Sequence, residues 1–209
     1  MKIQENITRL TDLETNDSLS SFMNHVAQQH HNVYQVFYDF MKNIKPKRIL
    51  EIGTSMGGFT QFLQRSSDDL KLSTKILSLD VNEQKWYDDI IEIGVDLRIE
   101  NIFIDNFSDI PQEYKDFINK EGTTVILCDG GDKIQEFNLL SNFIKKGDYI
   151  LAHDYVDTKE NFLENYKDKI WNWREIGDED IKETCKKYNL KSFMKETFDK
   201  VVWVCKIKE

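Results

Sequence analysis

The chain has 209 residues, of which 40% are hydrophobic and 12% aromatic, enough to build the core of one α/β domain. The formal net charge is -9, which argues against nucleic-acid and anionic-membrane partners because phosphate binding needs clustered Lys and Arg. No run is apolar and long enough for a membrane span or a signal peptide, so we expect a cytoplasmic protein. Cys128, Cys185 and Cys205 lack a C-x-x-C spacing and are expected to be free thiols.

Apolar residues three or four positions apart predict one long amphipathic helix from about Ser18 to Asn43. Phe37, Phe40 and Met41 near its end could supply the interface of a homo-oligomer. The rest of the apolar side holds Leu19, Phe22, Met23, Val26 and Val33, and His30 and His31 lie within the helix as residues without a ligand role.

Residues 47–60, which read KRILEIGTSMGGFT, predict a strand that turns sharply into a helix. The strand is expected over Arg48–Ile52, and Gly53 can take backbone angles that other residues avoid. Gly57 and Gly58 open the helix, where free N–H groups and the helix dipole meet a ligand. The buried side of this helix is expected to hold Phe59, Phe62 and Leu63.

The spacing of the glycines narrows the ligand of this turn. No Lys-Ser or Lys-Thr follows Gly58, as a phosphate loop requires, and Ser55 stands where a dinucleotide fingerprint needs its second glycine. What remains is E-x-G-x-x-x-G-G, in which Glu51 would repel phosphates but suits a ligand with an ammonium or sulfonium charge. This pattern resembles motif I of the class I S-adenosylmethionine-dependent methyltransferases. The resemblance implies that the cofactor is bound by Glu51, Gly53, Thr54, Ser55, Gly57 and Gly58.

Strands and helices alternate through the middle of the chain. Further strands are expected over Lys75–Asp80, Leu97–Ile104, Thr123–Asp129 and Tyr149–Asp154. Helices are expected over 83–95, Pro111–Lys120 and Lys133–Lys146, the last with Gly147 as its C-cap. Such alternation predicts an α/β fold with a doubly wound, mostly parallel sheet, in which ligands bind at the carboxyl ends of the strands.

An acid lies at the carboxyl end of each predicted strand. Carboxylates crowded on one edge of the sheet repel one another, so we interpret these acids as residues that bind a ligand or a metal ion. Asp80 lies 27 residues after Gly53 and is predicted to bind ribose hydroxyls, although such an acid can also cap the next helix. Asp105 and Asn106 could bind the adenine side or the ribose, or could simply form a turn. The acids at this edge are Glu51, Asp80, Asp105, Asp129 and Asp154.

After Asp154 the pattern changes to an aromatic and charged segment over residues 155–177. Trp171 and Trp173 share a face of an extended segment, and they either form a wall for the substrate or anchor the segment. We expect one domain over 1–209. Its parts are an N-terminal helical extension (1–45), a cofactor-binding core (46–154), a substrate-side insertion (155–190) and final strands (191–209). Within the last two parts we expect a helix over 178–188 and strands over Ser192–Thr197 and Lys200–Lys208.

Two segments sharpen the resemblance. Residues 126–132 place Asp-Gly after the fourth strand, and residues 146–155 place His-Asp after the fifth. This resembles the small-molecule O-methyltransferases of the macrocin and cephalosporin-hydroxylase type, relatives of catechol O-methyltransferase. The chain departs from their pattern at Asp132, where many relatives have histidine. The resemblance implies a Rossmann-like fold, S-adenosylmethionine as cofactor and a small-molecule acceptor.

Neighbouring strands lie about 4.8 Å apart, so Asp129 and Asp154 could share one Mg²⁺ that orients the acceptor oxygen. His153 is a candidate third ligand or general base, and Lys133 lies near the base lysine of the catechol enzymes, offset by one position. Alternatively, Asp129 caps the helix after it and His153 is an ordinary strand-end residue. We therefore predict O-methylation of a small molecule. A nicotinamide-dependent oxidoreductase and a non-catalytic S-adenosylmethionine-binding protein are the alternatives.

Overall fold

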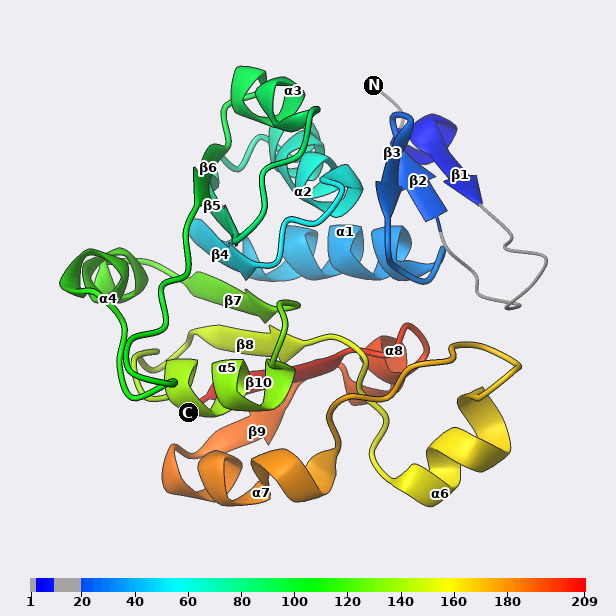
Figure 1. Ribbon diagram of the computed structural model, residues 1–209, viewed down its shortest axis with the longest axis vertical. Helices are drawn as coiled ribbons and strands as arrows, with labels where there is room; N and C mark the ends of the chain where they lie inside the picture. The colour runs from blue at the N-terminus through cyan, green and yellow to red at the C-terminus, as the bar shows by residue number, and fades with distance from the viewer. Residues whose placement is uncertain (1–2, 10–19) are drawn as a thin grey trace.

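The computed structural model describes residues 3–9 and 20–209. Its centre is a sheet with the strand order β6-β5-β4-β7-β8-β10-β9 (Figure 1). The first five of these strands are parallel, and β10 is antiparallel to both of its neighbours. The strands are β4 (Arg48–Ile52), β5 (Lys75–Asp80), β6 (Asp96–Ile99), β7 (Thr124–Cys128), β8 (Tyr149–Ala152), β9 (Leu190–Ser192) and β10 (Val204–Lys208).

Helices cover both faces of this sheet. One apolar core joins the sheet to α1 (Val33–Ile44), α2 (Gly58–Asp69), α3 (Tyr87–Glu92) and α8 (Lys195–Asp199). A second core on the other face joins it to α4 (Gln112–Asn119), α5 (Lys133–Leu140) and α7 (Asp178–Lys187). The chain after β8 continues through α6 (Lys159–Asn161) and a π-helical turn (Phe162–Tyr166). The predicted doubly wound α/β fold is confirmed.

The strand order reverses between β4 and β7, and this is where an open parallel sheet binds its ligands. The chain runs outward from β4 to β5 and β6, then crosses back to β7 and β8. The bounds predicted for β4 and β5 are confirmed. Each of these strands has a buried apolar middle that periodicity locates well.

The prediction of one long N-terminal helix is wrong. Ser18 and Leu19 lie outside the described residues, and α1 begins only at Val33, so His30 and His31 precede it. The chain before α1 forms a small antiparallel sheet (Figure 1), which consists of β1 (Ile7–Arg9), β2 (Ser20–Phe22) and β3 (His25–Ala27) after a 3₁₀ turn over Ile3–Asn6. Met23 and Asn24 take positive φ angles of 49° and 68° and turn β2 back into β3.

The interface predicted on α1 is also wrong. Phe37, Phe40 and Met41 are each only 1% exposed. The ring of Phe37 packs edge-on against Phe59 and Trp203 of the same chain, with centroids 4.9 and 5.1 Å apart. These side chains therefore belong to the core of one chain.

Other elements are shorter than predicted. α3 and β6 cover only part of 83–95 and Leu97–Ile104, and Pro111 is the N-cap of α4. α5 ends at Leu140, so Gly147 caps no helix and instead takes φ 86° in the turn before β8. The strand predicted over Ser192–Thr197 ends at Ser192, and α8 follows it, because Met194 takes a left-handed conformation.

Two features bear on the composition. Cys128, Cys185 and Cys205 are free, as expected. Among the described residues, no helix has the length and apolar character that crossing a membrane requires.

Candidate active site

The turn after β4 depends on Gly53. Its φ of +93° is a left-handed conformation, and a Cβ atom there would lie 2.2 Å from the carbonyl oxygen of Asp129. The backbone N–H of Asp129 in turn donates to the carbonyl of Ile52 across 3.0 Å. Gly53 therefore lets the ends of β4 and β7 approach each other at the switch point. The group that approaches Gly53 closely is thus the end of the neighbouring strand β7.

The glycine pair begins α2. Gly57 is the N-cap with φ 76°, and a Cβ atom on Gly58 would lie 2.3 Å from the carbonyl oxygen of His25. Gly58 thus allows the N-terminal hairpin to sit against the start of the helix. Within the same turn, the N–H of Ser55 donates to Asp80 Oδ2 across 2.7 Å, so Asp80 holds the turn in shape.

Glu51 lies beneath the turn and is 2% exposed. Its Oε2 accepts hydrogen bonds from Thr60 Oγ1 (2.7 Å) and Ser78 Oγ (2.5 Å), and Thr54 Oγ1 lies 2.6 Å from Ser78 Oγ. Burial raises the pKa of Glu51 to about 7, against the lowering effect of these hydroxyl donors. Glu51 lines neither of the two cavities described below. It can therefore act on a bound ligand only indirectly, by holding the turn above it in shape.

Two cavities meet at the switch point. The first has a volume of about 380 Å³ and the second of about 480 Å³. Both are lined by Gly53, Ser55, Asp129 and Gly130. A ligand that crosses this shared floor can occupy both cavities at once, with one end in each.

The second cavity receives Asp80 but not Asp105 or Asn106. Because β6 ends at Ile99, the residues at the sheet edge are Glu100 and Asn101, which do line the cavity. Asp105 and Asn106 take positive φ angles of 41° and 56° in the turn that follows. The rings of Phe103 and Phe107, also in the lining, lie 4.3 Å apart.

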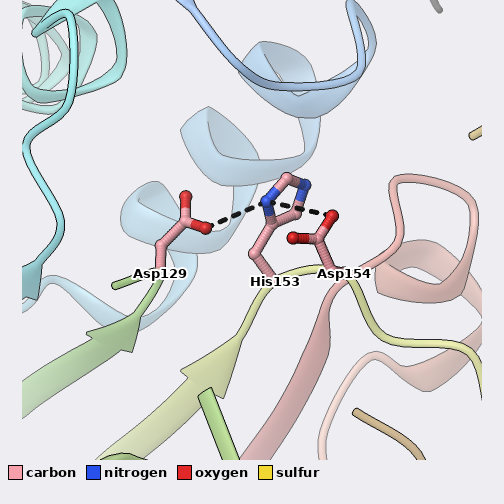
Figure 2. Close-up of side chains that lie close together, drawn as sticks. All are labelled: Asp129, His153 and Asp154. Carbon is pink, nitrogen blue, oxygen red and sulfur yellow. Dashed lines mark hydrogen bonds and ion pairs between the residues drawn. The ribbon is translucent and has the colours of Figure 1, made fainter. Parts of the chain in front are cut away.

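Asp129, His153 and Asp154 lie together at the ends of β7 and β8 (Figure 2). His153 Nδ1 is 3.1 Å from Asp129 Oδ1 and 3.7 Å from Asp154 Oδ1. One ligand atom from each residue can be chosen so that all three lie within 4.8 Å of one another. Two carboxylates and an imidazole form a donor set that fits a divalent cation, so the predicted grouping is present.

Two uncharged side chains each donate a hydrogen bond to one oxygen of these carboxylates, which we call the outer oxygen. Gln29 Nε2 donates to Asp129 Oδ2 across 2.6 Å, and Trp171 Nε1 donates to Asp154 Oδ1 across 2.5 Å. Gln29 is itself held by Trp203, whose Nε1 donates to Gln29 Oε1 across 2.9 Å. Sequence reasoning missed Gln29, because it stands one hundred positions before Asp129 in a segment assigned to a helix.

Lys133, the first residue of α5, places its ammonium group among three carboxylates. Its Nζ lies 2.8 Å from Glu175 Oε2, 3.1 Å from Asp154 Oδ2 and 3.7 Å from Asp129 Oδ1. Burial alone would lower the pKa of Lys133, but Asp129, Asp154 and Glu175 outweigh it and raise that pKa. Lys133 is therefore held as a cation.

Unlike charges in the cluster support one another. Burial and the nearby Lys133 ammonium would lower the pKa of His153, but Asp154 and Asp129 outweigh them and raise it. Burial alone would raise the pKa of Asp154, but His153 and Lys133 lower it. Asp154 is thus held as a carboxylate. The helix after β7 is capped by Asp132, whose Oδ1 accepts from the N–H of Gln135 across 3.1 Å, and not by Asp129.

The segment after β8 closes the first cavity. Trp171 is buried, Trp173 is 44% exposed, and their ring centroids lie 5.3 Å apart. Both line the cavity beside Glu175 and Met56. Trp171 therefore anchors the segment through Asp154, whereas Trp173 offers a free aromatic face.

Comparison with known proteins places this chain in a family. No curated protein sequence matches the chain. Among solved structures, cmcI with Mg and SAM superposes with a TM-score of 0.60 at 11% identity, over 90% of this chain and 76% of that one. A cmcI structure with SAH gives a TM-score of 0.59 at 12% identity, over 95% of this chain and 85% of that one.

A third structure, provisionally assigned as a caffeoyl-CoA O-methyltransferase from Staphylococcus aureus, gives a TM-score of 0.52 at 14% identity, over 85% of this chain and 83% of that one. At such identities these likenesses establish the fold. A sequence model of FtsJ-like methyltransferases matches residues 28–201, which include β4 to β9 and every residue of the cluster. The chain therefore belongs to the FtsJ-like methyltransferase family, which confirms the prediction of an S-adenosylmethionine-dependent methyltransferase.

Proposed function

We propose that this chain transfers a methyl group from S-adenosylmethionine to an oxygen atom of a small molecule. The observation that carries the proposal is the pair of cavities joined over Gly53, Ser55, Asp129 and Gly130. One cavity takes the nucleoside end of the donor, and the other takes its methionine end together with the acceptor. The fold shared with cmcI, which has been described with SAM and with SAH, supports this placement.

The donor is held from the strand ends. Asp80, which lines the second cavity, accepts hydrogen bonds from ribose hydroxyls, in keeping with its position after the second strand of the sheet. Glu100 and Asn101 take the role that we expected of Asp105 and Asn106 on the adenine side, because they line the cavity and that pair does not. Glu51 acts from beneath by fixing the turn of Gly53, Gly57 and Gly58.

The acceptor lies in the first cavity between Trp173 and the floor. Its hydroxyl oxygen attacks the methyl carbon, and the carbon–sulfur bond breaks with its electron pair on sulfur, which yields S-adenosylhomocysteine. Asp129, which lines both cavities, takes the hydroxyl proton, and the Lys133 ammonium stabilises the negative charge that develops on oxygen. His153 and Asp154 position these two groups. Most of the acceleration comes from alignment of the reacting atoms.

Asp129, His153 and Asp154 would hold a divalent cation such as Mg²⁺. Such an ion would lower the pKa of an acceptor hydroxyl and fix its oxygen. The chain's own residues determine how readily the ion enters, because Lys133 already faces both carboxylates.

The lining of the first cavity favours a small acceptor over a nucleic acid. Its charged groups are the carboxylates of Asp129, Asp154 and Glu175, the ammonium of Lys133 and the imidazole of His153. The lysine is engaged with all three acids, so it offers little to a phosphate backbone, which needs several cations.

The test is transfer of a labelled methyl group from S-adenosylmethionine to a panel of phenols and sugar hydroxyls. We expect product with at least one hydroxylated acceptor, and we expect Asp129→Asn to lose turnover while it still binds S-adenosylhomocysteine. Donor binding without turnover on any acceptor would instead identify the chain as a non-catalytic binding protein.

A further inference from the structure

Lys133 lies where a metal ion would have to bind. The outer oxygens of the two aspartates are taken by Gln29 and Trp171, so the inner oxygens, Asp129 Oδ1 (also 3.1 Å from His153 Nδ1) and Asp154 Oδ2, are the ones that face Lys133. Lys133 Nζ is 3.7 Å from the first of these oxygens and 3.1 Å from the second. The carboxylate pair therefore already has a cation of its own.

A divalent cation cannot share this position. Mg²⁺ needs its oxygen ligands at about 2.1 Å, so it would bind the same inner oxygens and lie within a few ångströms of the ammonium. Two positive charges at that distance repel strongly at a position as buried as that of Lys133, whose side chain is 7% exposed. Entry of the ion thus requires Lys133 to leave Asp154 Oδ2.

Glu175 offers Lys133 another partner. Glu175 Oε2 lies 2.8 Å from Nζ, and the Glu175 side chain is 46% exposed, so the pair can move outward together. The carbonyl oxygen of Gly130 also accepts from Nζ across 3.2 Å. The backbone N–H of Glu175 donates to the carbonyl of Asp154 across 2.9 Å, so the Glu175 backbone stays beside the cluster while its side chain and Lys133 move outward.

We propose that Lys133 and a divalent cation compete for the Asp129–Asp154 pair, and that Glu175 keeps Lys133 when the cation enters. The inference rests on the active site proposed above, and it concerns metal affinity, which is measured apart from activity. Lys133 then sets how strongly the enzyme depends on a metal. At low metal concentration the ammonium alone supplies the positive charge beside the acceptor.

The experiment titrates Mn²⁺ into the donor-free full chain and measures the bound ion by calorimetry and by electron paramagnetic resonance. Lys133→Met removes the ammonium from beside both inner oxygens, and we expect it to tighten Mn²⁺ binding by about tenfold or more. Glu175→Gln removes the second partner and should weaken Mn²⁺ binding, which gives an opposite change at an exposed position. Lys120→Met, an exposed lysine at the end of α4, makes the same change of charge elsewhere and should leave the affinity within about twofold.

The proposal is overturned if Lys133→Met binds Mn²⁺ no more tightly than the natural chain, if Glu175→Gln binds it more tightly, or if no variant binds it. S-adenosylhomocysteine is titrated into every variant as well. If the natural chain does not bind S-adenosylhomocysteine, the proposed function is contradicted. If it binds S-adenosylhomocysteine but the Mn²⁺ affinity is the same in all variants, only the competition is contradicted.

Discussion

Gln29 Nε2 donates a hydrogen bond to Asp129 Oδ2 across 2.6 Å and so joins the N-terminal segment to the floor of the active site. The same side chain accepts from Trp203 Nε1 across 2.9 Å, just before β10. Gln29 is 2% exposed and Trp203 is 0% exposed, so the indole N–H cannot donate to solvent instead. Asp129 is thereby held in one orientation by a residue far from it in sequence.

Replacing Gln29 with Ala should affect both stability and catalysis. The change leaves the buried indole N–H of Trp203 without its acceptor and the partly buried Asp129 Oδ2 without its donor, which should lower the free energy of unfolding by about 1 to 3 kcal/mol. It also frees the Asp129 side chain, so we expect kcat to fall by roughly tenfold or more. Urea unfolding and initial-rate measurements test both effects. The control is Gln112→Ala at the exposed start of α4, away from both cavities, and equal losses in the two variants would contradict the role of Gln29.

Two glycines with similar φ angles, Gly53 and Gly94, distinguish the effect of backbone strain from that of a steric clash. Gly94 takes φ +98°, and no atom lies within 4 Å of the place that a Cβ atom would occupy, whereas at Gly53 (φ +93°) a Cβ atom would lie 2.2 Å from Asp129 O. Gly94→Ala should therefore cost about 1 to 2 kcal/mol of unfolding free energy from backbone strain alone. Gly53→Ala should cost clearly more and should also abolish binding of S-adenosylhomocysteine. Equal free energies of unfolding and equal affinities for S-adenosylhomocysteine in the two variants would show that the close approach of β4 and β7 does not contribute to function.

Glu51 should give the stability of the protein a pH dependence. Its pKa is raised by burial from 4.5 to about 7 in the folded chain, so the folded state keeps a proton that the unfolded state loses. The contribution of Glu51 is present below the lower value and is lost as pH rises through the upper one. Relative to the natural chain, Glu51→Gln should thus gain stability on the order of 2 to 3 kcal/mol between about pH 5 and pH 8. Denaturant unfolding at both pH values measures it, and parallel pH profiles would count against a protonated Glu51.

Trp171 and Trp173 should differ in which kinetic constant they control. Trp171→Phe removes the donor to Asp154 Oδ1, so the pKa of Asp154 should rise and kcat should fall. Trp173→Phe shortens an exposed aromatic face and should mainly raise the KM of the acceptor. Steady-state kinetics with one acceptor that the chain methylates tests this difference between effects on kcat and on KM. A larger effect of Trp173→Phe on kcat would reverse the roles assigned to the two residues.

Sequence patterns located those parts of the fold that periodicity encodes. The buried strands β4 and β5 have the predicted bounds, and Asp129, His153 and Asp154 do meet at adjacent strand ends because parallel strands end on one edge. The hairpin of β2 and β3 was missed because Phe22 and Val26 also fit a helical spacing, and the left-handed Met23–Asn24 turn outweighs that pattern. Here tertiary packing decides between two local conformations.

The partners of the site residues were beyond reach for a different reason. Gln29 and Glu175 reach the cluster only through loops whose path depends on the whole fold. Likewise, Asp105 and Asn106 were placed at a strand end because β6 was expected to continue to Ile104, whereas it ends at Ile99 and Glu100 and Asn101 occupy the edge. An error of a few residues in one strand thus moved the predicted adenine contacts.

Titration of S-adenosylhomocysteine into the purified chain by calorimetry tests the central claim most directly, namely that the methyl donor spans the two joined cavities. We predict one bound ligand per chain, an affinity at least about tenfold weaker in Asp80→Ala, and no change in Asp105→Ala, since Asp80 lines the second cavity and Asp105 does not. No binding to the natural chain, or equal effects of the two aspartates, would contradict it.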